Sequence, residues 1–189
     1  IREDRADGAI VLRAAQPLGA YEPSLARLFR RAVERQPDRL LMAERDAAGA
    51  WAGVTYAQAR RKADAIAQAL IDRGLSAERP VMVLSGNAVE HGLLTLACYT
   101  AGIPIAPISV AYSLQSQDHA KLKYINELLT PGLVYVSDTA PFAKALAHIT
   151  APIVAGKNGA SLPNVTLFAD LENTTPGPAV EQAASAIRP

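Results

Sequence analysis

The chain has 189 residues, of which 50% are hydrophobic and 20% are charged, and its formal net charge is +1. This length fits one domain, or a domain with an appendage, and it is sufficient to bury a hydrophobic core. The near-neutral charge excludes the basic surface with which nucleic-acid-binding proteins neutralise phosphates, so we expect no nucleic-acid partner.

The first elements are a short strand and a helix. A strand is predicted over residues 9–13, after the turn at residues 7–8. Ser24 then has the character of a helix N-cap, and apolar residues recur at helical spacing as far as about Arg35. The pair Gln36-Pro37 is expected to end this helix.

A β-hairpin and a second helix follow. Residues 39–45 and 51–55 read as two strands joined by a short loop that contains glycine. Thr55 and Gln58 have the spacing of a capping box and predict a helix to about Asp72. Gly74 is expected to close that helix in the left-handed conformation.

After residue 80 the pattern changes to short apolar runs that alternate with helical segments. Such alternation predicts parallel strands joined by right-handed helical crossovers. The expected strands are residues 81–84, 103–108, 133–136 and 152–155, and the expected helices are residues 88–100, 117–129 and 141–149. The fold class is therefore α/β: an open, mainly parallel sheet flanked by helices, with an N-terminal β-hairpin.

The domain organisation is expected to divide near residue 156. Residues 1–155 form the α/β unit, and residues 156–189 form a loop-rich extension with a short strand at 165–168 and a helix at 178–187. Residues 156–161 are interpreted as a surface loop. They lack the G-x-x-x-x-G-K-[ST] spacing of a phosphate-binding loop.

Candidate ligand-facing residues lie where the predicted parallel strands end, because ligands of open α/β sheets bind beyond the carboxyl ends of the strands. Three turns qualify. The first contains Ser85, Gly86 and Asn87, and its backbone amides either hold an anion or serve a capped helix start. The second ends at Tyr112, whose ring is expected to pack over the adjacent helix. The third contains Ser137 and Asp138, for which helix capping is the preferred interpretation.

The remaining reactive residues give no clear site. Cys98 lies in an apolar run and is interpreted as a buried thiol, and a single cysteine allows no internal disulfide. His91, His119 and His148 are dispersed in the sequence, so we expect neither a metal site nor a catalytic base; His119 is expected at the solvated surface. No run approaches the roughly 20 apolar residues of a membrane span. We expect no membrane partner and a cytoplasmic location.

Several segments together resemble the N-terminal region of adenylate-forming, AMP-binding acyl-CoA synthetases. They are residues 53–56 (GVTY), 79–87 (RPVMVLSGN), 101–107 (AGIPIAP) and 133–138 (LVYVSD). The wording of residues 109–123 is most similar to feruloyl-CoA synthetases. The resemblance implies a partial N-terminal subdomain of that fold. The whole enzyme would use ATP, Mg²⁺ and CoA to convert an acid to its acyl-CoA through an acyl-adenylate.

The resemblance places no catalytic residue and no cofactor site in this chain. The Ser/Thr/Gly-rich loop that ends in Pro-Lys and cradles the phosphates in that family is absent from the 189 residues. We therefore expect an inactive fragment whose partner is the remainder of the enzyme and which self-associates through exposed apolar surface. Two alternatives stay open: a self-contained flavodoxin-like module that binds a small ligand or partner, and a purely structural interaction protein.

Overall fold

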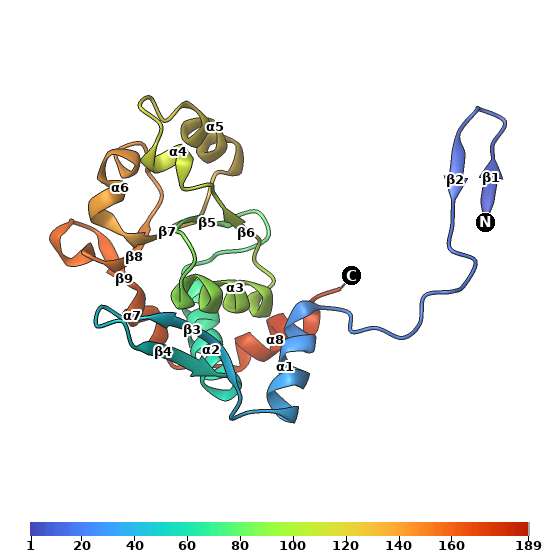
Figure 1. Cartoon of the computed structure of the whole chain (residues 1–189), viewed down its shortest axis with the longest axis horizontal. Coiled ribbons are helices and arrows are strands. Elements are labelled where there is room, and N and C mark those ends of the chain that lie inside the picture. The colour runs from blue at the N-terminus through green and yellow to red at the C-terminus, as the bar shows by residue number, and fades with distance from the viewer. Residues whose placement is uncertain (189) are drawn as a thin grey trace.

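A five-stranded parallel sheet lies at the centre of the chain in a computed structural model that describes residues 1–188 (Figure 1). Its strand order is β6-β5-β7-β8-β9, and each neighbouring pair is parallel. The strands are β5 (Val81–Leu84), β6 (Ile105–Pro107), β7 (Leu133–Asp138), β8 (Ile153–Lys157) and β9 (Val165–Leu167). The α/β class with a mainly parallel sheet is confirmed.

Helices cover both faces of this sheet, which explains why its central strands are almost continuously apolar. Side chains alternate between the two faces along β5: Val81 and Val83 belong to one core, and Met82 and Leu84 to the other. Helices α2, α3, α7 and α8 lie on the first face, and α4, α5 and α6 on the second (Figure 1). The helices are α1 (Leu25–Arg35), α2 (Tyr56–Asp72), α3 (Val89–Ala101), α4 (Ala111–Leu114), α5 (Ala120–Leu129), α6 (Thr139–Leu146), α7 (Phe168–Glu172) and α8 (Pro178–Ala186), with a 3-10 turn at Gly159–Ser161.

The helix ends follow the local signals in the sequence. Ser24 caps α1 by accepting a hydrogen bond from the amide of Arg27, and Thr55 and Gln58 form the predicted capping box of α2. Gly74 and Gly102, which follow α2 and α3, both adopt φ of +68°. Glycine tolerates this left-handed conformation without steric cost, so the predictions for Ser24, for the Thr55–Gln58 box and for Gly74 are confirmed.

Two hairpins precede the sheet. The predicted one is formed by the antiparallel strands β3 (Leu40–Arg45) and β4 (Trp51–Thr55). A second, smaller hairpin joins β1 (Arg2–Asp4) to β2 (Ile10–Leu12), of which only the second strand was predicted. Figure 1 shows this small hairpin standing apart from the rest of the chain on an extended segment.

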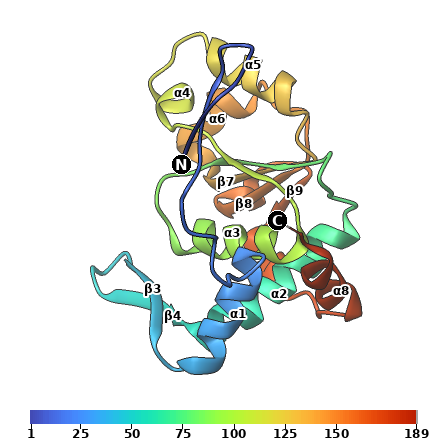
Figure 2. The ribbon, with the colours of Figure 1, turned by 90° about the vertical axis from the view of Figure 1, so that its right-hand side faces the viewer.

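The elements after β8 pack on the same core as the rest. The expected division after residue 155 falls inside β8, and β9 adds a fifth strand next to it. Phe168 and Leu171 of α7 and Val180 of α8 are buried in the core formed with α2 and α3. Helices α1 and α8 lie close together (Figure 2), where Arg30 forms an ion pair with Glu181.

Three local predictions were wrong. The expected loop after β6 contains the short helix α4, and the following helix begins at Ala120 rather than at Gln117. The loop expected over residues 156–161 is instead the end of β8 and a 3-10 turn. Within residues 1–188, no helix combines the length and the apolar character needed to cross a bilayer.

Candidate functional site

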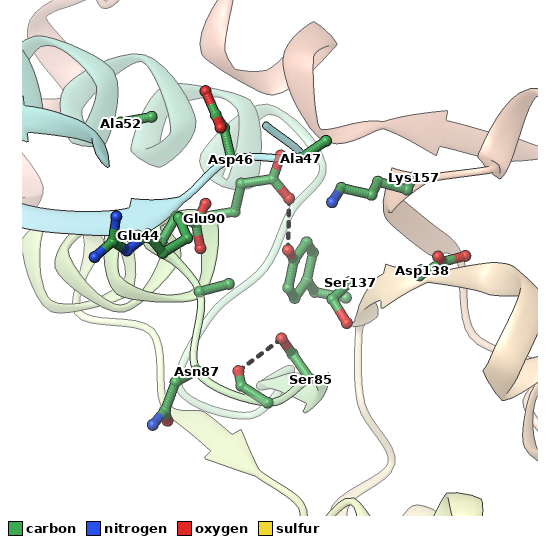
Figure 3. Close-up of a pocket in the computed structure, with 14 residues that line it drawn as sticks. Glu44, Asp46, Ala47, Ala52, Ser85, Asn87, Glu90, Ser137, Asp138 and Lys157 are labelled. Carbon is green, nitrogen blue, oxygen red and sulfur yellow. Dashed lines mark hydrogen bonds between the residues drawn. The ribbon is translucent and has the colours of Figure 1, made fainter. Parts of the chain in front are cut away.

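A cavity of about 630 Å³ lies at the carboxyl ends of β5 and β7, beneath the β3–β4 hairpin (Figure 3). Counted among the parallel strands, the sheet order is 2-1-3-4-5, so the chain connections reverse direction between β5 and β7. Such a switch point is where open α/β sheets bind ligands. The volume is within the range of small-molecule sites. The cavity is lined by Glu44, Arg45, Asp46, Ala47, Ala52, Ser85, Gly86, Asn87, Ala88, Glu90, Tyr135, Ser137, Asp138 and Lys157.

The first predicted turn lies in this cavity, but its helix start is not capped from within the turn. The N-cap of α3 is Ala88, and no side-chain hydrogen bond from the described residues is made at that position. Instead, the carboxylate of Glu44 in β3 accepts a hydrogen bond from the amide of Val89 at 3.1 Å. A carboxylate at a helix N-terminus is stabilised by the helix dipole. The helix start that could hold an external anion is therefore occupied by an anion of the chain itself.

Polar side chains at the first turn contact the backbone of the turn itself. Ser85 is buried and donates its hydroxyl to the carbonyl of Gly86 at 2.8 Å. His91, in the first turn of α3, has its Nδ1 atom 3.2 Å from the same carbonyl oxygen. The carbonyl of Gly86 thus has two polar neighbours. The turn is tied to its own helix rather than presented as an open loop.

The third predicted turn also lies in the cavity, and its capping role is confirmed. Asp138 is the N-cap of α6 and accepts hydrogen bonds from the amide of Ala140 at 2.9 Å and from Nδ2 of Asn158 at 2.8 Å. The hydrogen bond from Asn158, followed by that from Ala140, lowers the pKa of Asp138. Asp138 therefore contributes a stable negative charge to this end of the sheet.

The partly buried Glu90 and the buried Tyr135 form a hydrogen-bonded pair in the cavity. Tyr135 in β7 is fully buried, and its hydroxyl donates to Oε2 of Glu90 at 2.7 Å (Figure 3). Burial raises the pKa of Glu90; the Tyr135 hydrogen bond opposes this rise, and the carboxylates of Glu172 and Glu44 add to it. Burial, and then the hydrogen bond to Glu90, raise the pKa of Tyr135. Both groups are held in a low-dielectric setting.

Gly156 in β8 makes room for this pair. A Cβ atom at this position would overlap Oε2 of Glu90 and would lie 2.8 Å from the carbonyl oxygen of Ser137. Lys157, the next residue, extends into the cavity and opposes the rise in the pKa of Glu90 (Figure 3). The close approach of Glu90 and of the Ser137 backbone therefore explains why β8 has a glycine at residue 156.

The chemistry of the cavity is predominantly acidic. Four carboxylates, Glu44, Asp46, Glu90 and Asp138, face two cations, Arg45 and Lys157. The Arg45 guanidinium lies 4.3 Å from the centre of the Trp51 ring and donates to the carbonyl of Gly49, so it is engaged within the hairpin. In residues 1–188, no group of three or more His, Cys, Asp or Glu side chains has the arrangement of a metal site.

Tyr112, the remaining predicted residue, lies elsewhere. It belongs to α4 and is partly buried against the core of the opposite face of the sheet. The ammonium group of Lys121 in α5 lies 5.1 Å from the centre of its ring, so the predicted packing over the adjacent helix is confirmed. The structure thus brings Ser85, Gly86, Asn87, Ser137 and Asp138 together and separates Tyr112 from them.

Nine of the fourteen lining residues were not predicted, among them Glu44, Glu90, Tyr135 and Lys157. One signal in the sequence could have pointed to Glu44. The helix start at residues 85–89 offers no Asp or Thr at the capping position, so its amides require a partner from another part of the chain. The Glu90–Tyr135 contact joins residues 45 apart and has no local signature.

Comparison with known proteins gives a consistent result. A family model described as AMP-binding enzyme matches residues 29–177. Tyrocidine synthase 3 from Brevibacillus parabrevis is 26% identical over 160 residues, which are 80% of this chain and 2% of that protein.

Two solved structures share the fold. A putative long-chain-fatty-acid CoA ligase from Rhodopseudomonas palustris superposes with a TM-score of 0.65 at 22% identity, covering 81% of this chain and 37% of that one. A luciferase-like enzyme from the mealworm Zophobas morio superposes with a TM-score of 0.68 at 16% identity, covering 89% of this chain and 36% of that one. The chain therefore spans little more than a third of these solved chains.

Proposed function

Since the chain belongs to the AMP-binding enzyme family, we propose that it is the N-terminal α/β part of an ATP-dependent acid–CoA ligase with a feruloyl-CoA synthetase-like specificity. In that reaction the acid carboxylate attacks the α-phosphorus of ATP, giving an acyl-adenylate and pyrophosphate. The thiol of CoA then displaces AMP to give the acyl-CoA. Mg²⁺ would accompany ATP, and the enzyme would act in the cytoplasm.

The family match over residues 29–177 is the observation that carries this proposal. The similarity of residues 109–123 to feruloyl-CoA synthetases supports an aromatic acid as substrate. The structural similarity to acyl-CoA ligases supports the fold. The contribution of this chain would be to hold the phosphate loop and the acid pocket, carried by other segments, on a rigid parallel sheet.

We further propose that the 189 residues by themselves catalyse no adenylation. They contain no Ser/Thr/Gly-rich loop ending in Pro-Lys. The acidic cavity supports this view, because its excess of carboxylates repels a triphosphate. The partner of the chain would be the remainder of the enzyme.

The test is acid-dependent exchange of radiolabelled pyrophosphate into ATP. The 189-residue chain should give no exchange with ferulate, whereas the product of the full reading frame should give exchange that is faster with ferulate than with acetate or a long-chain fatty acid. Exchange by the 189 residues alone would refute the scaffolding role. Exchange by the full product only with fatty acids would refute the aromatic specificity and leave the ligase assignment intact.

A second candidate, a flavodoxin-like module that binds a small ligand, is favoured by one observation. The strand order is that of flavodoxin-like sheets, and the cavity lies at their usual binding position. Size and dye binding separate the candidates. A ligase part should self-associate and bind a hydrophobic dye through exposed apolar residues such as Leu25, Leu28 and Leu40, whereas a complete module should be monomeric and bind none.

A further inference from the structure

The structure brings two of the three histidines into contact on the face of the sheet opposite α2 and α3. The ring centres of His119 and His148 are 5.2 Å apart, and the ring planes are inclined by 49°. His119 immediately precedes α5, and His148 follows the end of α6. Helices α5 and α6 lie together on this side of the sheet (Figure 1). The expectation that His119 is a solvated surface residue was wrong, because its exposed fraction is 4%.

The hydrogen bond of His119 fixes which ring nitrogen carries a lone pair. Its Nε2 atom lies 3.1 Å from the carbonyl oxygen of Ser113, and a carbonyl oxygen can only accept. Nε2 of the neutral ring is therefore protonated, and Nδ1 carries the lone pair. Within residues 1–188 the ring of His119 is thus bonded to the chain through Nε2, and it lies against the ring of His148. Metal-binding histidines characteristically donate their other ring nitrogen to a carbonyl or carboxylate in this way.

The separation of the two rings also fits a shared metal ion. Two imidazoles bound to one tetrahedral Zn²⁺, with Zn–N distances of about 2.1 Å, have their ring centres roughly 5 Å apart. The observed separation is 5.2 Å. His148 is exposed to solvent, so an ion has access and water can complete its coordination.

We propose that His119 and His148 form an open, two-histidine site for a divalent late transition-metal ion such as Zn²⁺. Imidazole nitrogen suits Zn²⁺, Cu²⁺ and Ni²⁺ rather than Mg²⁺ or Ca²⁺. The bound ion connects the start of α5 to the end of α6. The only thiol of the chain does not compete, because Cys98 is buried and burial raises its pKa to about 12.

Isothermal titration of the untagged 189-residue chain with ZnCl₂, together with thermal unfolding at increasing ZnCl₂, tests the site. We expect saturable binding of one ion and a melting temperature that rises with its concentration. His148→Gln should weaken binding by more than about tenfold while the metal-free protein melts as before, because His148 is exposed. His91→Gln is the matched control: it removes a lone histidine and should leave binding unchanged.

NMR distinguishes metal binding from a purely structural contact between the two rings, because such a contact would give no Zn²⁺-dependent shift of the ring nitrogens. In long-range imidazole ¹H–¹⁵N spectra, Zn²⁺ should shift the nitrogens of His119 and His148, and those of His91 should stay in place. The proposal is overturned if Zn²⁺ binds no more tightly to the chain than to His148→Gln, or if His91→Gln abolishes binding.

Discussion

Gly156→Ala should destabilise the chain far more than an alanine at Gly86, the glycine that lines the cavity. A Cβ atom at residue 156 overlaps Oε2 of Glu90 and lies 2.8 Å from the backbone oxygen of Ser137. Glu90 can rotate away, but only by releasing the hydroxyl of Tyr135, which is fully buried. The backbone oxygen has no such freedom.

The magnitude follows from these two contacts. Leaving the buried hydroxyl without its partner costs about 1–3 kcal/mol. Displacing packed backbone by the added methyl costs a further ~1–3 kcal/mol. We therefore expect the free energy of unfolding to fall by about 2–6 kcal/mol, which for a chain of this length lowers the melting temperature by roughly 4–24 °C.

Urea unfolding followed by circular dichroism measures this loss. Fluorescence is less suitable, because Trp51 is 66% exposed in the hairpin and reports on its stacking with Arg45. Gly86→Ala is the matched control. Its Cβ would meet nothing within 4 Å in the described part of the chain, so the free energy of unfolding should change by less than about 0.5 kcal/mol.

A double-mutant cycle with Tyr135→Phe separates the two contributions. If the orphaned hydroxyl accounts for part of the cost, Gly156→Ala should cost less in the Tyr135→Phe background, with a coupling energy above about 1 kcal/mol. Additive effects, or a Gly156→Ala variant as stable as Gly86→Ala, would refute the reasoning.

Three further predictions concern the same structure. Burial raises the pKa of Glu90, so the folded chain binds the carboxyl proton more tightly than the unfolded chain. Ionisation of Glu90 therefore destabilises the fold increasingly as pH rises from about 4.3 through the folded pKa. In urea titrations, Glu90→Gln should lose less stability than the unmodified chain between pH 4 and pH 7, and equal dependence on pH would contradict this. Thr55→Ala removes the acceptor for the amide of Gln58 and should cost about 1 kcal/mol of unfolding free energy, with Thr55→Ser as the control that keeps it. In the described chain, the two strands of residues 1–20 pair only with each other. Deletion of these residues should therefore leave the urea midpoint of unfolding unchanged within experimental error. A lower midpoint would show that residues 1–20 contact the rest of the chain.

Local signals in the sequence predicted much of the fold. The caps at Ser24 and Thr55 and the left-handed glycines 74 and 102 are decided by a few neighbouring residues. The fully buried strand at residues 81–84 was recognisable because both of its faces are apolar. Proline within a sheet is confined mainly to edge strands and bulges, and β6, which ends at Pro107, is an edge strand.

The cavity was only partly predictable, because its polar contacts join distant parts of the chain. Ser85 and Asp138 could be predicted because they lie at the carboxyl ends of predicted parallel strands, which meet at the same edge of the sheet. The spacing of apolar residues does not predict which side chain of the hairpin contacts the start of a helix. The hydrogen bond between Glu44 and the amide of Val89 was therefore missed. The same holds for His119 and His148, which lie 29 positions apart and meet only because α5 and α6 share a face.

The two helix starts at the switch point are consistent with the supporting role proposed for this edge of the sheet. Helix α3 is closed by the carboxylate of Glu44, and α6 is closed by that of Asp138. A phosphate group binds such amides only after it displaces the internal carboxylate and overcomes the repulsion of its neighbours. If the chain is part of an ATP-dependent ligase, as proposed, the phosphates of ATP would bind amides and a cation on another segment. In the proposed ligase that segment would be the signature loop of the family, and the cavity between these two helix starts would not bind the nucleotide.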